Sequence, residues 1–156
     1  MSDFDLTRYL PYLINRTGVR IANVFTEAIR GQGITLQMWR VLAALDHADG
    51  QRISDLAALT SIDVSTLSRL LDAMQDKGLT ERRRSNVGDA RVVKVYATEA
   101  GHGLTAKIIP LARHYEAVAL KGLSAEEIRA LKSMLVRVYG NIAALEDEAR
   151  SETEAA

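Results

Sequence analysis

The segment from Asp63 to Thr98 changes its apolar spacing from three or four residues to two, and this change constrains the fold more than any other feature. The first part, DVSTLSRLLDAMQDKG, predicts a helix that Asp63 caps and Gly78 ends. The runs LTERRRS and VVKVYAT then alternate as strands do, and residues 86–89 between them have the chemistry of a hairpin turn. The sequence therefore predicts a helix that leads directly into a β-hairpin.

This helix has an apolar face and a small, polar face. The apolar residues are Val64, Leu67, Leu70, Leu71 and Met74, and the polar ones are Ser65, Thr66, Ser68, Arg69 and Asp72. A shorter helix, SDLAALTS, which we expect Ser54 to cap, comes just before it, after a break at residues 61–62. Two short helices followed by a basic hairpin are typical of a winged helix-turn-helix, while a helical pair with a solvated face is the alternative.

Charge is balanced over the whole chain but not along it. Twenty basic residues match twenty acidic ones. Residues 82–94 nevertheless contain five basic residues and one acidic, and residues 146–154 contain five acidic and one basic. The hairpin, called the wing below, therefore suits a polyanion, although such asymmetry is also common on solvated surfaces.

Longer helices flank this central part. Apolar residues at helical spacing predict a first helix that ends near Gly31 and Gly33, and Thr35 is placed to cap a second. Thr98 is placed to cap a fifth helix, and residues 124–127 (SAEE) form a capping box that begins a sixth. The sixth helix carries Ile128, Leu131, Leu135, Val138, Ile142 and Leu145 as a continuous apolar seam. The seam requires a partner helix, either in a second copy of the chain or within a monomer.

Several function classes are excluded by composition. The chain has no cysteine, and His47, His102 and His114 have no histidine or carboxylate partner three or four residues further along the chain. No nucleophile elbow, phosphate loop or paired carboxylates occur, so we expect no catalytic residues, no metal and no cofactor. The N-terminus lacks a signal sequence, and no window is apolar enough to span a membrane. We predict a cytoplasmic protein that is not an enzyme.

The stretch VSTLSRLLDAMQDKGLTERRRSNVGDARVVKVYATEAG, residues 64–101, resembles the MarR (multiple antibiotic resistance) family of winged helix-turn-helix regulators. The matching positions are Gly78, Leu79 and Arg82 at the entry to the wing, Asp89 and Arg91 in the wing, and Thr98 and Gly101 at the start of the next helix. The order of elements is similar from the first helix to about residue 150. The resemblance implies a mainly α fold with a small β-wing and long N- and C-terminal dimerisation helices.

Within a single domain of residues 1–156, the resemblance implies two parts. Residues 35–98 would bind DNA, with a recognition helix at about 64–77 and the wing at about 79–98. Residues 8–31 and 99–150 would form the helical dimerisation part. The interface residues we expect are Leu10, Leu13, Leu111, Tyr115, Leu131, Leu135, Val138, Ile142 and Leu145. Such a homodimer would bind a pseudo-palindromic, double-stranded DNA operator.

The DNA-binding residues we expect lie on the helix-turn-helix and the wing. They are Ser54, Ser65, Thr66, Ser68, Arg69, Arg82, Arg83, Arg84, Asp89 and Arg91. The resemblance implies that Arg91 enters the minor groove. Asp89 would form an ion pair with Arg91, Arg82 or Arg84 and so orient the wing, or it would simply form the turn.

The family also commonly binds small anionic, often aromatic, effectors between the dimerisation helices and the winged part. The candidate ligand-binding residues are Tyr9, Tyr12, Asn15, Arg16, Arg20, Trp39 and Arg40. Arginines beside aromatic rings suit an aryl acid or its thioester. Packing in the core or the dimer interface is the alternative role for Trp39 and the tyrosines.

We therefore expect a cytoplasmic, homodimeric transcriptional repressor that a small ligand releases from DNA. One alternative is a constitutive or architectural DNA-binding factor without an effector. Another is a protein-interaction module on the winged scaffold.

Overall fold

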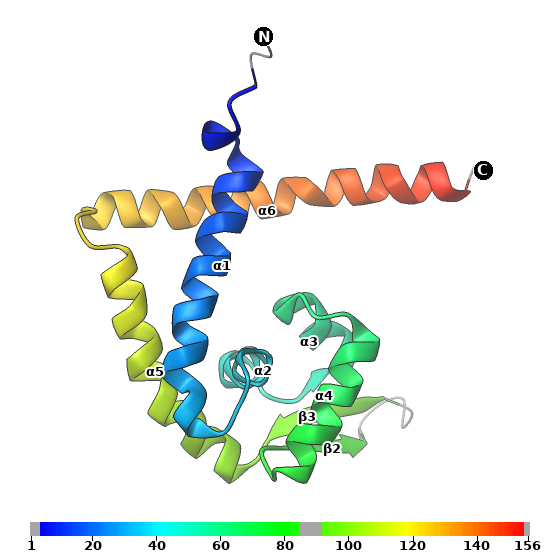
Figure 1. Ribbon diagram of the computed structural model, residues 1–156. Helices are drawn as coiled ribbons and strands as arrows, with labels where there is room; N and C mark the ends of the chain where they lie inside the picture. Colours follow the sequence, from blue (N-terminus) through cyan, green and yellow to red (C-terminus); the bar gives the residue numbers. More distant parts are fainter. Residues whose placement is uncertain (1–3, 85–91, 155–156) are drawn as a thin grey trace. The chain divides into compact units, whose positions relative to one another are not determined.

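The structure, a computed structural model, describes residues 4–84 and 92–154, with side chains described as far as residue 145. It is mainly helical with a small antiparallel sheet, which confirms the predicted fold class (Figure 1). In chain order the elements are η1 (Leu6–Arg8), α1 (Leu10–Ile29), η2 (Arg30–Gln32), α2 (Leu36–His47), β1 (Gln51–Arg52), α3 (Ile53–Thr60), α4 (Val64–Asp76), β2 (Thr80–Arg84), β3 (Val93–Ala97), α5 (Glu99–Ala119) and α6 (Ala125–Glu154).

The chain divides into two compact units, Met1–Tyr115 and Glu116–Ala156. The first unit contains α1 to α4, the sheet and most of α5, and the second contains the end of α5 and all of α6. No helix in residues 4–84 and 92–154 is long and apolar enough to cross a membrane.

Most of the predicted helix ends are confirmed by side-chain hydrogen bonds. The Asp63 carboxylate accepts from the backbone N–H of Thr66 (2.9 Å) at the start of α4. Thr35 caps α2 in the same way, with its hydroxyl 3.2 Å from the N–H of Met38. Gly78 adopts φ 68°, as a residue that ends a helix in the left-handed conformation does. These interactions satisfy backbone groups that the helix ends would otherwise leave unpaired.

Two predictions about the short helices are wrong. Ser54 does not cap α3, because the helix begins at Ile53 and the N-cap is Arg52, which makes no side-chain capping bond. The reason is that β1 pairs with β3 through Arg52 and runs straight into α3, so Ser54 already lies in the first turn. Val64 does not belong to the buried face of α4, since it is 55% exposed at the first position of the helix.

The core of the first unit is built around α2. Leu42 and Val41 are completely buried there, and Leu67 of α4 and Val95 of β3 lie in the same cluster. Burial of each such side chain contributes roughly 1.5–3 kcal/mol relative to its exposure to water. The core thus holds the second helix of the helix-turn-helix and the sheet together.

The sheet has the strand order β1-β3-β2, and both pairings are antiparallel. Val95 in the central strand lies opposite Gln51 on one side and Arg82 on the other. The base of the hairpin is attached to α4, because the Thr98 hydroxyl donates to the carbonyl of Gly78 (2.6 Å) and accepts from the N–H of Gly101 (3.0 Å). Thr98 therefore caps α5, as predicted, and also connects it to the end of α4.

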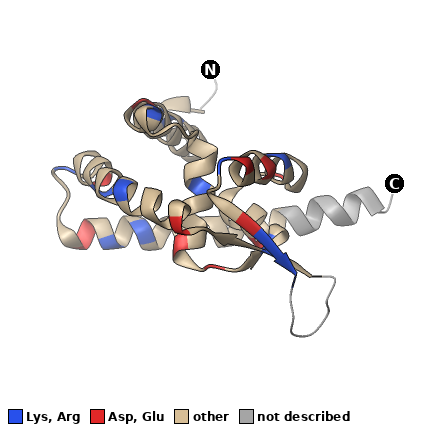
Figure 2. Cartoon of the chain, turned by 90° about the horizontal axis from the view of Figure 1, so that it is seen from below, with Lys and Arg blue, Asp and Glu red and all other residues tan. Residues whose placement is uncertain are grey.

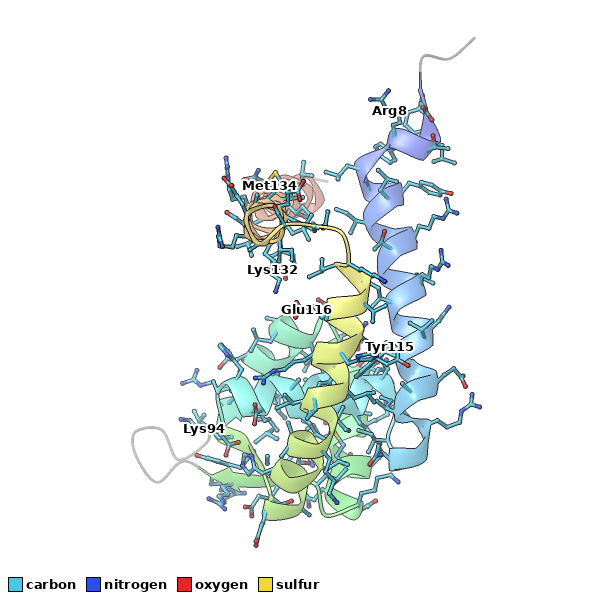
Figure 3. The ribbon with its side chains drawn as sticks, turned by 90° about the vertical axis from the view of Figure 1, so that its left-hand side faces the viewer. Arg8, Lys94, Tyr115, Glu116, Lys132 and Met134 are labelled. Atoms are coloured by element: carbon cyan, nitrogen blue, oxygen red, sulfur yellow. The ribbon has the colours of Figure 1, made fainter. Side chains whose placement is uncertain are left out.

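In the second unit, the predicted capping box at the start of α6 is confirmed. The Ser124 N–H donates to the Glu127 carboxylate (2.7 Å), and the Ser124 hydroxyl accepts from the Glu127 N–H (3.2 Å). Lys132 of α6 forms an ion pair with Glu116 in the last turn of α5 (2.7 Å; Figure 3). This surface pair and the box fix the turn between the two helices.

Candidate nucleic-acid interface

The start of α4 is a network of short polar side chains around Asp63. The Ser65 hydroxyl donates to the Asp63 carboxylate (2.7 Å), which also accepts from the Thr66 N–H. Hydrogen bonds from Ser65 and then Thr66 hold the pKa of the Asp63 carboxyl far below its ordinary range. Because the Ser65 proton is used in this bond, the outer side of its oxygen is left to accept hydrogen bonds from a ligand.

The outward face of α4 continues with Arg69. Ser65 and Arg69 are exposed, while Thr66 and Ser68 are half-buried. The exposed surface of α4 is therefore mainly polar at these four predicted residues, with Val64 as an exposed apolar side chain at its start. Such a surface can approach a DNA groove closely, because serine and threonine reach base edges and phosphates while arginine supplies charge.

Strand β2 presents three consecutive arginines, and its basic end is blue in Figure 2. Side chains alternate along a strand, so Arg82 and Arg84 lie on one face and Arg83 on the other. Arg83 stacks over the Tyr96 ring (4.8 Å to the centroid) and pairs with Glu81. The hydrogen bond that Arg83 donates to Glu81, and the negative charge of that carboxylate, raise the pKa of the Arg83 guanidinium. Arg84 is exposed at the end of the strand.

Arg82 differs from its neighbours because its guanidinium is bound to α4. It donates to the Asp72 carboxylate (2.6 Å) and to the backbone carbonyl of Ser68 (3.0 Å). Only 25% of its side chain is exposed. The resemblance implies that Arg82 contacts DNA, whereas the structure places its charged end against α4.

Two predicted residues, Asp89 and Arg91, lie outside the described residues. The ion pair proposed for Asp89 therefore stays a prediction. Of its candidate partners, Arg82 already binds Asp72.

One structural residue was missed by the sequence analysis. Asp49, between α2 and β1, accepts a hydrogen bond from the backbone N–H of Ala97 in β3 (3.0 Å) and lies 3.7 Å from the His102 ring. Asp49 thereby attaches the wing strand to the end of α2. Its sequence context, Asp-Gly after a helix, indicates only a turn and gives no sign of a partner 48 residues away.

Trp39 and Arg40 are the two candidate ligand-binding residues that the structure brings together around a cavity. They line a hollow of about 260 Å³ between α1 and α2, together with Gly18, Ile21, Ala22, Phe25 and Leu36. They also line a second hollow of about 530 Å³, together with Ala43, Ala44 and His47 of α2 and with Leu59, Thr60 and Ser61 at the end of α3. Trp39 is half-buried against Phe25, with the ring centroids 5.9 Å apart, so packing is part of its role.

The other candidate ligand-binding residues line neither hollow. Tyr9 packs against Phe4, with the ring centroids 5.1 Å apart, and Arg16 lies over the ring of Tyr12 at 5.9 Å. Asn15 and Arg20 are exposed on α1. Gly18, Ile21 and Ala22 could not be identified from the sequence, because small and aliphatic residues give no chemical sign of a cavity.

Residues predicted for the dimer interface fall into three groups. Leu10, Leu13, Leu135, Ile142 and Leu145 are between 41% and 62% exposed. Leu131 and Val138 are half-buried. Leu111 and Tyr115 are half-buried and pack on the core of their own unit, where Tyr115 (labelled in Figure 3) meets Phe25 edge-on with ring centroids 5.6 Å apart. No group of three or more side chains that could hold a metal ion occurs in the described part of the chain.

The helix-turn-helix, its adjoining basic strand and the three-stranded sheet define a winged helix-turn-helix protein. Residues 34–93 match the model of the MarR family. A crystal structure of a MarR-family transcriptional regulator from Silicibacter pomeroyi has 31% sequence identity and a TM-score of 0.81, and covers 91% of this chain and 95% of that chain. The chain belongs to the MarR family and is a DNA-binding transcriptional regulator.

Two further similarities are to a transcriptional repressor and to a regulator whose DNA binding responds to a small molecule. The transcriptional repressor IacR of Pseudomonas putida is 25% identical over 134 residues, which are 86% of this chain and 80% of the repressor. A structure of BpsR from Bordetella bronchiseptica, whose DNA binding is regulated by 6-hydroxynicotinic acid, has a TM-score of 0.78 and covers 88% of this chain and 98% of that chain. Its sequence identity is 22%, so this likeness shows the fold alone.

Proposed function

We propose that the protein is a homodimeric repressor that binds a pseudo-palindromic operator through α4 and the wing. The observation that carries the DNA-binding mode is the outward face of α4, which is mainly polar and presents Ser65, Thr66, Ser68 and Arg69. This helix would enter the major groove. Arg83 and Arg84, and Arg91 further along the wing, would contact phosphates or the minor groove beside it.

Dimerisation is supported by apolar side chains that are exposed in a single chain. On α1 they include Leu10 and Leu13, and on α6 they include Leu135, Ile142 and Leu145. Exposed leucines in a helical series are costly for an isolated molecule and are typical of a subunit interface. A two-fold symmetric protein presents two copies of α4, so its preferred DNA has two related half-sites.

Repression and release by a ligand are supported by two different observations. IacR, a relative that spans most of the chain, is a repressor. The hollow between α1 and α2 places an indole ring and a guanidinium at one cavity, and this combination suits a small aromatic carboxylate or its thioester. A ligand that binds the DNA-free conformation more tightly than the DNA-bound conformation would lower the affinity for the operator. The ratio of the two ligand affinities sets the largest decrease it can cause.

Selection from random duplex DNA at a stated salt concentration tests this proposal. The expected result is a two-fold symmetric consensus whose half-sites lie about one helical turn, roughly 34–36 Å, apart. Absence of any enriched sequence at low salt would contradict it. Loss of binding on addition of an aryl acid or its thioester separates a ligand-controlled repressor from a constitutive DNA-binding factor.

A further inference from the structure

Arg82 connects the wing to the recognition helix at two points. It lies in the middle of β2, opposite Val95. One guanidinium nitrogen, Nη1, is 2.6 Å from the Asp72 carboxylate, and the other, Nη2, is 3.0 Å from the carbonyl oxygen of Ser68. Ser68 and Asp72 are four residues apart, so the guanidinium spans one turn of α4.

A two-point contact of this kind fixes orientation as well as distance. The guanidinium is planar, and its donors point in fixed directions, so holding two acceptors one turn apart restricts rotation of the strand against the helix. A lysine at this position would keep the charge but offer one compact ammonium group instead of a planar fork. The geometry therefore depends on arginine in particular.

The contact is also in the right place to control the wing. The base of the hairpin is already attached to α4, because Thr98 binds the carbonyl of Gly78. Arg82 adds a second attachment four residues beyond Gly78, further along the strand that leads to the wing. At the level of Arg82 the third strand, β1, pairs with β3 and not with β2, so Arg82 attaches the outer strand of the wing to α4.

We propose that Arg82 is a positioning residue, which holds the wing in register with α4 so that both meet DNA as one rigid unit, and that it makes no DNA contact of its own. This inference rests on the proposed binding of DNA by α4 and the wing. A wing that became ordered only during binding would lose conformational entropy, and this loss would lower its affinity for DNA. A wing that is already held in place avoids this cost. Asp72 acts with Arg82, although its negative charge on a DNA-facing helix would by itself weaken binding.

A double-mutant cycle on the full-length protein tests the proposal, with affinity for the selected operator as the measurement. Arg82→Ala and Asp72→Asn should each weaken binding roughly tenfold, and the double variant should be no weaker than either single one. Arg82→Lys should behave like Arg82→Ala. If Arg82 instead contacted a phosphate, Asp72→Asn would strengthen binding, the effects would be independent and lysine would substitute well.

Arg84→Ala is the matched control, because Arg84 lies two residues along on the same face of β2 and is exposed. The loss of operator affinity caused by Arg84→Ala should add to the loss caused by Asp72→Asn, so the double variant should be weaker than either single one. Melting temperatures of the free variants separate positioning from folding. A purely structural role would lower the melting temperature and leave the affinity of the folded protein unchanged, and that outcome overturns the proposal.

Arg69→Ala separates failure of this inference from failure of the proposed function. If Arg69→Ala weakens binding but the effects of Arg82→Ala and Asp72→Asn are additive, the coupling is wrong and the proposed function stands. If the wild-type protein selects no DNA, or if Arg69→Ala changes nothing, both proposals fail.

Discussion

Gly101, in the first turn of α5, lies directly against the backbone carbonyl of Leu79, with no room between them for a Cβ atom. A Cβ on Gly101 would collide with that carbonyl oxygen and lie 3.2 Å from its carbon. The carbonyl also accepts a hydrogen bond from the N–H of Thr98 (3.1 Å), so it cannot move away freely. The MarR-like Thr-x-x-Gly pattern thus has a steric basis at the junction of α4, β2 and α5.

Gly101→Ala should therefore destabilise the protein. Crowding against rigid backbone costs about 1–3 kcal/mol, which outweighs a gain of up to about 1 kcal/mol from the better helix propensity of alanine. Gly103→Ala is the control, since nothing lies within 4 Å of a Cβ at Gly103 in the same helix, and it should stabilise. Urea denaturation measures both changes. Equal effects of the two substitutions would show that the Leu79 contact is unimportant.

The cap of α4 should give a measurable pH dependence. The pKa of the Asp63 carboxyl is lowered by folding from its ordinary value of 3.8, so the carboxylate stabilises the folded state at neutral pH. That stabilisation is complete above the ordinary pKa and is lost as the pH falls below it. The free energy of unfolding should drop more steeply for the wild type than for Asp63→Asn between about pH 5 and pH 2. Asparagine still caps the helix but does not titrate in this range, and parallel curves would refute this role.

Binding of an effector should be visible through Trp39. It is the chain's single tryptophan and lines both hollows, so its fluorescence reports directly on occupancy. Titration with aryl carboxylates and their thioesters should change the emission of the wild type, and Arg40→Ala should weaken that response about tenfold through loss of a charge-assisted contact. Arg20→Ala is the matched control, because Arg20 is exposed and lines neither hollow. A larger effect of Arg20→Ala would move the ligand site elsewhere on α1.

Dimerisation should depend on the apolar face of α6. Leu135→Asp places a charge in the proposed interface, where a buried unpaired carboxylate is strongly unfavourable, and it should give a monomer with weakened operator binding. Ser133→Asp adds the same charge to the opposite face of the helix and should leave the dimer intact. Sedimentation equilibrium measures both masses. A dimeric Leu135→Asp variant would show that this face is not the interface.

Local features of the fold were predictable from the sequence. Asp63, Gly78 and Thr35 act on backbone groups within a few residues of themselves, so their identity and position are enough to predict the helix ends. Ser54 is the exception, because the pairing of β1 with β3, more than forty residues apart, sets the start of α3. The predicted start of α3 was therefore wrong because a contact between distant segments, and not a local sequence signal, sets it.

The same limit applies to the candidate site. The polar face of α4 follows from helical spacing alone, so Ser65 and Arg69 could be predicted. The attachment of Arg82 to Asp72 could not, since it depends on how strand β2 lies against α4. Tyr115 packs on Phe25, a contact that sequence spacing does not reveal, and its place in the dimer interface stays a prediction.

In the proposed complex with DNA, the outward faces of two copies of α4 read two symmetric half-sites. Parallel selections with the wild type and with Arg69→Ala, at one salt concentration, test it most directly. We predict a two-fold symmetric wild-type consensus and, for the variant, loss of preference at the same position in both half-sites, worth about 1–3 kcal/mol. Identical consensus sequences for the two proteins, at equal affinity, would show that Arg69 on the outward face of α4 does not read DNA.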